Sequence, residues 1–292
     1  MNRHPFPNLL VFLPVLILSI ADANDAAMND GSEGPEPIGW RSGTESIIQM
    51  QSEHLRIHFG VEMTQVHAAF TFLSHKTSGP ARQKLGFPIA SRSDLDGDVI
   101  GPIENLVTRV NGEVIESELV EGFYEQIVKP DGSVFYEKHD KAPDPENPGL
   151  VRKHAWYVIE VEFPVGKPVV VEREYSCPTG ADTSMNAFFI YETRTGGAWK
   201  GAIEKLTAEV TFDETVRTDL VFFSPESGWS WNRDRTLATL VWETFEPRLE
   251  DDRTYFEVST LHIKRIEELH REYPEDFPPL ERWIAIRRGE EP

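Results

Sequence analysis

The chain has 292 residues, of which 29 are Lys or Arg and 49 are Asp or Glu, so its formal net charge is -20. This excess of acid argues against a nucleic-acid partner, because a phosphate backbone is bound by clustered cations, and it would repel an anionic membrane surface. Hydrophobic residues make up 39% and aromatic residues 11% of the chain, enough to bury a sizeable core.

The N-terminus has the organisation of a secretory signal peptide over residues 1–23. Arg3 and His4 precede an apolar run from Leu9 to Ile20, and Ala21-Asp22-Ala23 supplies the small residues that a signal peptidase accepts. The run is too short to span a bilayer core about 30 Å thick as a helix. We therefore predict cleavage after Ala23, export to the periplasm or the extracellular space, and no stable membrane insertion of the mature protein.

Composition divides the rest of the chain into four segments. Residues 24–45 are rich in small, polar and acidic residues and predict a flexible leader. Residues 46–150 and 151–260 predict two β regions, separated by the charged, proline-rich loop 138–150. Residues 261–292 predict a C-terminal helix and tail, with Ile263, Ile266 and Leu269 as the apolar stripe of the helix.

Period-two hydrophobicity predicts the strands, for example Val66, Ala68, Phe70 and Phe72 on one face. Hairpins are predicted for residues 106–117, about a type I′ turn at Asn111-Gly112, and for residues 123–137. Further strands are expected at residues 156–163, 167–175, 187–192, 206–212, 219–223, 237–243 and 255–260. The pattern predicts an all-β, antiparallel β-sandwich fold, as two sandwich units or one enlarged sandwich, with one short C-terminal helix over 261–272.

Asp94, Asp96 and Asp98 place three carboxylates at alternate positions, as the first part of a calcium-binding loop does. The remaining positions depart from that pattern, because Val99 stands where the sharp turn needs Gly and Asn105 where a bidentate Glu is expected. The alternative is an acidic surface turn. Calcium is the one metal that the sequence suggests, and no other cofactor is expected.

Histidines and acids offer weaker patterns for chemistry. His54 and His58 would share one strand face, as would His67 and His75, but no HExxH or comparable cluster provides three zinc ligands. Glu160 and Glu162 would also share a face, which is equally typical of a solvated strand. We find no Gly-x-Ser-x-Gly, Ser-x-x-Lys or phosphate-loop motif.

Cys177 is the only cysteine, which excludes an intramolecular disulfide. A nucleophilic thiol needs a neighbouring His and a depressed pKa. Its position at the end of a strand-like run favours a small residue half-buried at a strand end.

Three tryptophans are candidate ligand-binding residues. Trp229 and Trp231 are two residues apart, so on a strand both rings face the same way and could form a platform for a sugar or an apolar ligand. Trp199 lies in a glycine-rich turn. The alternative is that these rings fill the core of the sandwich, and we expect this for at least one of Trp229 and Trp231.

Several segments together resemble a family of exported bacterial proteins known as a domain of unknown function. The resemblance rests on Phe70-Thr-Phe72, Phe87-Pro88, Trp156, Phe163-Pro-Val-Gly-Lys167, the strand Val169 to Tyr175, and Thr195-Gly-Gly-Ala-Trp-Lys-Gly201. It implies export and a β-rich fold, and it carries no catalytic residues.

A fainter resemblance is to the β-sandwich domain of vault proteins and inter-alpha-trypsin inhibitor chains, through Phe87-Pro-Ile89, Asn111-Gly-Glu-Val-Ile115 and Tyr124. The metal-binding Asp-x-Ser-x-Ser that commonly follows such domains is not present, because Asp182-Thr-Ser184-Met-Asn186 departs at its last position.

The function that these observations favour is that of a non-enzymatic, exported β-sandwich protein that binds a protein partner or a small ligand in the periplasm or at the cell surface. The alternative is a hydrolase of cell-envelope material, with two carboxylates converging from different strands.

Overall fold

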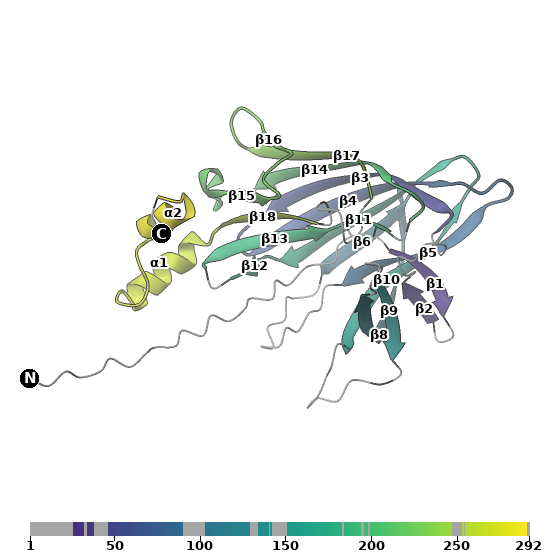
Figure 1. Cartoon of the computed structure of the whole chain (residues 1–292), viewed down its shortest axis with the longest axis horizontal. Helices are drawn as coiled ribbons and strands as arrows, with labels where there is room; N and C mark the ends of the chain where they lie inside the picture. Colours follow the sequence, from purple (N-terminus) through teal and green to yellow (C-terminus); the bar gives the residue numbers. More distant parts are fainter. Residues whose placement is uncertain are drawn as a thin grey trace, which may run out of the picture.

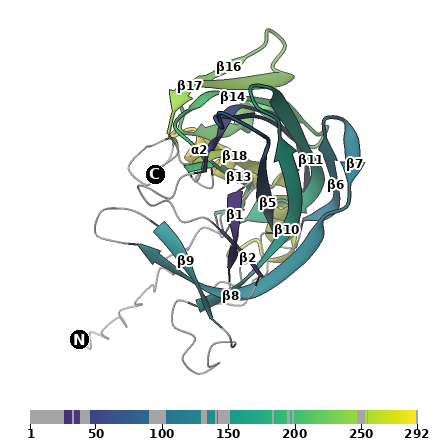
Figure 2. The same cartoon turned by 90° about the vertical axis from the view of Figure 1, so that its right-hand side faces the viewer.

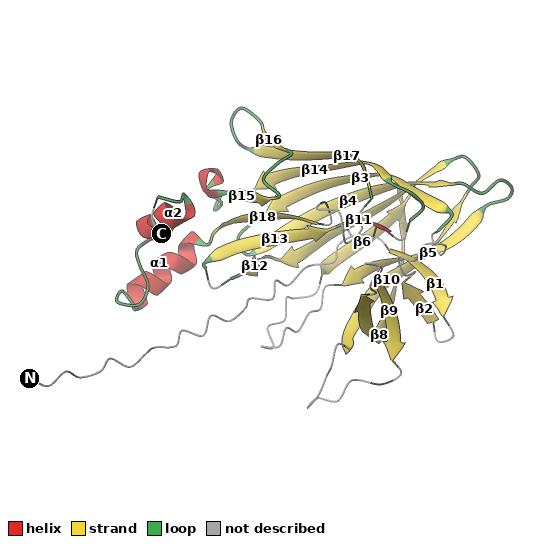
Figure 3. Ribbon diagram, viewed as in Figure 1, coloured by secondary structure: helices red, strands yellow, loops and turns green. Residues whose placement is uncertain are grey.

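The computed structural model describes residues 26–31, 34–37, 46–89, 103–128, 134–139, 141, 151–182, 184–193, 196–197, 199–246, 253 and 255–290. Most of them lie in three β-sheets, with helices at one end (Figures 1 and 3). The all-β fold predicted from the alternating pattern is therefore confirmed. The signal peptide prediction for residues 1–23 lies outside the described residues.

The largest sheet has eight strands, β3 (Ile48–Phe59), β4 (Met63–Ser74), β6 (Glu104–Val110), β7 (Glu113–Ile115), β11 (Pro168–Pro178), β14 (Ile203–Phe212), β16 (Trp229–Trp231) and β17 (Leu237–Phe245). Their spatial order is β16-β17-β14-β3-β4-β11-β6-β7. Neighbours are antiparallel except β3 and β14, which run parallel. Strands from both halves of the sequence thus belong to one sheet.

Two smaller sheets complete the fold. One contains β1 (Ala26–Gly31), β2 (Gly34–Pro37), β5 (Ala81–Ile89), β8 (Glu118–Val128), β9 (Val134–His139) and β10 (Val151–Phe163), in the order β2-β1-β5-β10-β8-β9. The other contains β12 (Gly180–Ala181), β13 (Asn186–Glu192), β15 (Phe222–Ser224) and β18 (Tyr255–Leu261), in the order β12-β13-β18-β15. Figure 2 shows the large sheet curving around both.

One apolar core joins the three sheets. Every second residue from Val66 to Phe72 is buried on the inner face of β4, as the alternation predicts. From there Phe72 meets Phe163 of the six-stranded sheet, with ring centroids 5.9 Å apart. Toward the other end, Trp242 of β17 meets Phe256 of the four-stranded sheet at 6.2 Å. The inner face of the large sheet is therefore covered by different sheets along its length.

The structure differs from the sequence expectation in the tract 24–45, of which residues 26–31 and 34–37 form β1 and β2. β1 pairs with the edge of β5. Backbone hydrogen bonds hold such a strand whatever its side chains, so the composition of the tract gave no signal for it.

The Asn111-Gly112 hairpin is confirmed, with positive φ values of 52° and 85° at the two turn residues. The hairpin predicted over 123–137 forms as β8 and β9. β10 and β11 follow one another through Pro164-Val165-Gly166 but enter different sheets. Two strands joined by a short turn have the same local sequence pattern whether they pair in one sheet or, as here, enter two different sheets.

Two helices follow the last strand, α1 (Ile263–Glu272) and α2 (Leu280–Arg287). α1 is the predicted helix, and it buries Ile266 and Leu269. α2 was not predicted, because it buries no residue and carries no clear apolar stripe. Neither helix of the described chain has the length and apolar character needed to cross a bilayer.

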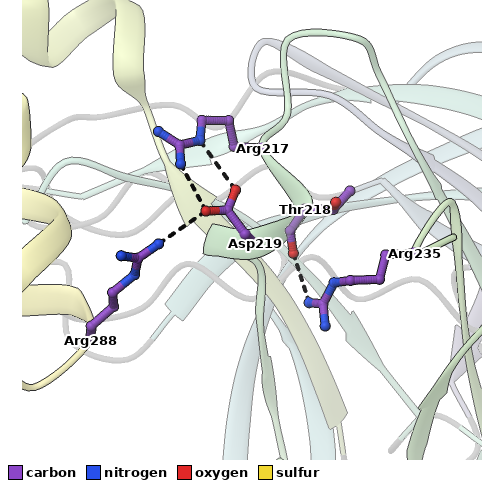
Figure 4. A network of polar contacts seen from close by, with 5 residues as sticks. All are labelled: Arg217, Thr218, Asp219, Arg235 and Arg288. Carbon is purple, nitrogen blue, oxygen red and sulfur yellow. Dashed lines mark hydrogen bonds and ion pairs between the residues drawn. The ribbon is translucent and has the colours of Figure 1, made fainter. Parts of the chain in front are cut away.

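A small polar network ties α2 to the β-sheets (Figure 4). It is centred on Asp219 in a 3-10 turn, η2 (Thr218–Leu220). Arg217 donates two hydrogen bonds to the Asp219 carboxylate, at 3.2 and 2.8 Å, and Arg288 at the end of α2 donates a third at 3.1 Å. The hydrogen bonds from Arg217 lower the pKa of Asp219, and the charge of Arg288 adds to this.

We expect Asp219→Asn to lower stability at neutral pH and to lose this effect in acid. A lowered folded-state pKa stabilises the fold above the ordinary value of 3.8, and this stabilisation is lost as the pH falls through the lowered pKa. Urea unfolding of the wild type and of Asp219→Asn, at about pH 7 and at about pH 2, measures the difference in their unfolding free energies. The effect should be modest, since the carboxylate is 48% exposed. An equal difference at both pH values would contradict the network.

We expect Trp199→Ala to destabilise the protein by about 3–5 kcal/mol, the range for truncating a buried aromatic side chain. Trp199 is 1% exposed, and its ring lies 4.7 Å from that of Phe72. Denaturant unfolding provides the measurement. Val114→Ala is the control, because Val114 is 69% exposed and its truncation should change stability by less than about 0.5 kcal/mol.

Candidate functional site

A pocket of about 420 Å³ opens on the outward face of the large sheet. It lies toward the end of the sheet where β3 turns into β4. At the same end, Glu62 of this turn approaches His262 at the start of α1, with 3.6 Å between oxygen and nitrogen. The pocket and the helices therefore share one end of the molecule.

Two rows of side chains, each crossing several strands, form most of the pocket lining. In the first row the register aligns Glu209 of β14, Arg56 of β3, His67 of β4 and Glu174 of β11. In the second row it aligns Leu237, Thr211, His58, Gln65 and Ser176 of β17, β14, β3, β4 and β11. Asn105 of β6 closes the β11 side. The rows form because outward residues recur at every second position.

Most charged groups of the pocket already have partners. Glu209 accepts from His54 at 3.2 Å, His67 lies 3.2 Å from Glu172, and Glu174 accepts from Arg109 at 3.0 Å. Each pair joins neighbouring strands on the outward face, where cross-strand polar pairs stabilise a sheet.

Four polar side chains of the pocket are different. Within the described residues, the guanidinium of Arg56, the amides of Gln65 and Asn105 and the hydroxyl of Ser176 have no hydrogen-bond or ion-pair partner. Asn105 has a positive φ of 57°, a conformation that Asn adopts more readily than most residues. A guanidinium with five donors and three neutral polar groups are thus free to bind a solute.

The alternating pattern placed His54 and His58 on one strand face, and the structure puts both on the outward face. His75 lies just beyond β4, within 2.8 Å of Gln49. In the part of the chain that the structure describes, no three His, Cys, Asp or Glu side chains converge as metal ligands. Asp94, Asp96 and Asp98 lie outside the described residues, so calcium binding there stays a prediction.

The three candidate tryptophans lie elsewhere. Trp199 is buried in the core. Trp229 and Trp231 are half-buried at the edge strand β16, where Trp229 stacks on Phe223 at 4.0 Å and Trp231 stacks on Phe212 at 5.3 Å. None of the three lines the pocket.

The paired carboxylates Glu160 and Glu162 do share an exposed face of β10, as expected. Both approach Arg82 of β5, at 3.9 and 3.3 Å. This contact accounts for the pair as a cross-strand ion cluster.

The side chain of Glu257 combines burial with a second carboxylate. Burial raises its pKa, and the nearby charge of Asp182 adds to the rise. A hydrogen bond with Ser259 and the charge of Arg287 limit this rise of the Glu257 pKa. Asp182 itself accepts hydrogen bonds from the backbone and side chain of Asn186. Arg287 comes from α2, so these groups bind the helix to β18.

Two charged residues are buried in the core. Arg173 of β11 is completely buried, donates to Thr108 at 2.6 Å and to Ser117 at 3.4 Å, and lies 5.3 Å from the ring centroid of Phe87. Glu53 of β3 is 1% exposed and accepts a hydrogen bond from Tyr191. These groups have partners inside the protein, and neither lines the pocket.

We expect Cys177 to be unreactive in the folded protein. The thiol is buried, and burial raises its pKa to about 12, so the nucleophilic thiolate does not form at neutral pH. Labelling with 5,5′-dithiobis(2-nitrobenzoate) should be slow in buffer and complete in denaturant. Rapid labelling of the native protein would show that the thiol is accessible.

No protein-family model matches the sequence, and neither does any curated protein sequence. Among solved structures, the fold is similar to that of a candidate nutrient-binding protein from Legionella pneumophila. The TM-score is 0.52 and the identity 18%, with 86% of this chain and 76% of the other covered. An M1 zinc metallopeptidase from Deinococcus radiodurans shares 9% identity at a TM-score of 0.34, covering 74% of this chain and 43% of the peptidase. At 18% identity, the similarity to the Legionella protein concerns the fold alone.

Proposed function

We propose that this is an exported, non-enzymatic β-sandwich protein that binds a small polar ligand in the pocket on the outward face of the large sheet. Export rests on the signal peptide signature of residues 1–23, and it would place the protein in the periplasm or at the cell surface.

The observation that carries the proposal is a set of donors and acceptors in one depression that have no partner among the described residues. A ligand site is a concavity with a few convergent polar groups, and its usual volume is about 300–1,000 Å³. The pocket of about 420 Å³ falls within that range. Arg56, Gln65, Asn105 and Ser176 converge there from three adjacent strands and β6.

The similarity to a candidate nutrient-binding protein supports the proposal at the level of fold. The position of the pocket supports it as well, since rigid strands hold the lining residues, which makes binding less costly in conformational entropy than a site on loops.

The alternative, a hydrolase with paired carboxylates, has less support in the described residues. Glu160 and Glu162 contact Arg82, and Glu257 lies within the electrostatic influence of Arg287 on α2 and does not line the pocket. Screening the protein with esterase, glycosidase, phosphatase and protease substrates tests this alternative. Turnover abolished by Glu257→Gln would favour it.

We expect thermal-shift screening of the purified protein against sugars, carboxylates, amino acids and phosphates to find a solute that raises the melting temperature. A ligand at a hundred times its Kd stabilises the folded state by about 2.7 kcal/mol. The double variant Gln65→Leu, Ser176→Ala should lose the shift, because it removes two pocket groups that have no hydrogen-bond partner among the described residues. Arg82→Gln, on the six-stranded sheet, is the control and should keep it.

A shift that persists in the double variant would place binding elsewhere. No shift with any solute class would contradict the proposed function.

A further inference from the structure

The charges around Arg56 restrict the ligand that the pocket can accept. Arg56 is the only guanidinium in the pocket lining, and it has no partner among the described residues. Its planar fork matches the two oxygens of a carboxylate. A carboxylate on the ligand would therefore complete a pairing that the protein leaves open.

An acidic group stands directly beside this guanidinium. Register pairs Arg56 with Glu209 on the adjacent strand β14, and adjacent strands lie about 4.8 Å apart. One oxygen of Glu209 accepts from His54, and the other has no partner within the described chain. The two side chains do not form an ion pair with each other, so each remains available to a ligand that carries both charges.

A carboxylate and an ammonium separated by a single carbon suit two side chains on neighbouring strands. That arrangement is an α-amino acid. Ligands with several negative charges fit poorly, because Glu209 lies directly beside Arg56 and Glu174 lies in the same row beyond His67, and both would repel them.

The remaining groups of the pocket indicate what kind of side chain the amino-acid ligand carries. On the opposite side of Arg56 from Glu209, the amides of Gln65 and Asn105 and the hydroxyl of Ser176 line the pocket without partners in the described residues. An apolar ligand side chain would cover these groups and leave them unpaired, which costs binding free energy. A polar side chain would satisfy them.

We propose that the pocket binds a polar α-amino acid, with the ligand carboxylate on Arg56, the ammonium on Glu209, and the polar side chain among Gln65, Ser176 and Asn105. This inference rests on the proposed function and specifies its ligand class.

Calorimetric titration with L-glutamine tests the assignment. Wild type should bind one equivalent. Arg56→Gln should weaken binding by at least about tenfold, as expected for losing a charged hydrogen-bond pair, and Glu209→Gln should weaken it similarly. Arg56→Lys keeps the charge but loses the fork and should fall between. Arg82→Gln, a comparable change on the six-stranded sheet, should bind like wild type.

Ligand analogues locate each contact. Glutaramate, which lacks the ammonium, should bind weakly and equally to wild type and Glu209→Gln. L-glutaminamide, which lacks the carboxylate, should bind weakly and equally to wild type and Arg56→Gln. Removing a protein group and its partner group on the ligand together measures that one interaction, and separates it from any general disturbance of the site by the substitution. L-leucine should bind more weakly than L-glutamine by about tenfold, because it leaves the amides unpaired.

The failures are distinguishable. If L-glutamine and L-serine do not bind, but another solute binds the wild type and does not bind the double variant Gln65→Leu, Ser176→Ala, the proposed ligand class is wrong and the binding function stands. L-glutamine binding that is unaffected by Arg56→Gln also overturns the assignment. If no solute class binds, both proposals fail.

Discussion

The inner face of the eight-stranded sheet has to be kept from water, and the rest of the architecture follows from how this is done. Its buried apolar residues extend from Phe72 on β4 to Trp242 on β17, and the two smaller sheets pack against different parts of this span. Phe163 covers one part and Phe256 the other. Because both smaller sheets pack on the inner face, the outward face of the large sheet is left uncovered by either of them.

Burial of Arg173 within this core fixes how neighbouring strands meet. Desolvating a guanidinium costs several kcal/mol unless hydrogen bonds and charge compensate. Thr108 and Ser117 accept hydrogen bonds from it, and Phe87 offers the face of its ring. These partners come from β6, the segment after β7, and β5. A slip of β11 by one residue would move the guanidinium to the opposite face and forfeit every one of them.

The sequence predicted the local elements of this structure, its strands and turns, but few of the contacts between residues that are far apart in the chain. Alternation from Val66 to Phe72 and the Asn111-Gly112 turn specify a strand and a hairpin, because the determining forces act within a few residues. The pocket is different. Arg56, Gln65 and Ser176 each read as outward-facing polar positions, and only the register of β3, β4 and β11 brings them together. Cross-strand register depends on packing between residues far apart in sequence, which alternation does not encode. The same holds for α2, whose attachment depends on Asp219 and Ser259.

The parallel contact between β3 and β14 has a consequence for the order in which the chain folds. His54 and Glu209 are 155 residues apart, so the centre of the large sheet closes one of the longest loops in the molecule. Contacts of such separation slow folding, since the entropy of loop closure is lost before packing compensates. During synthesis β3 and β4 can pair early, but the far edge of β3 has no partner until residue 212 has emerged. That exposed strand edge is the site where a nascent chain would first pair with a neighbour, and where a holding chaperone would be most useful.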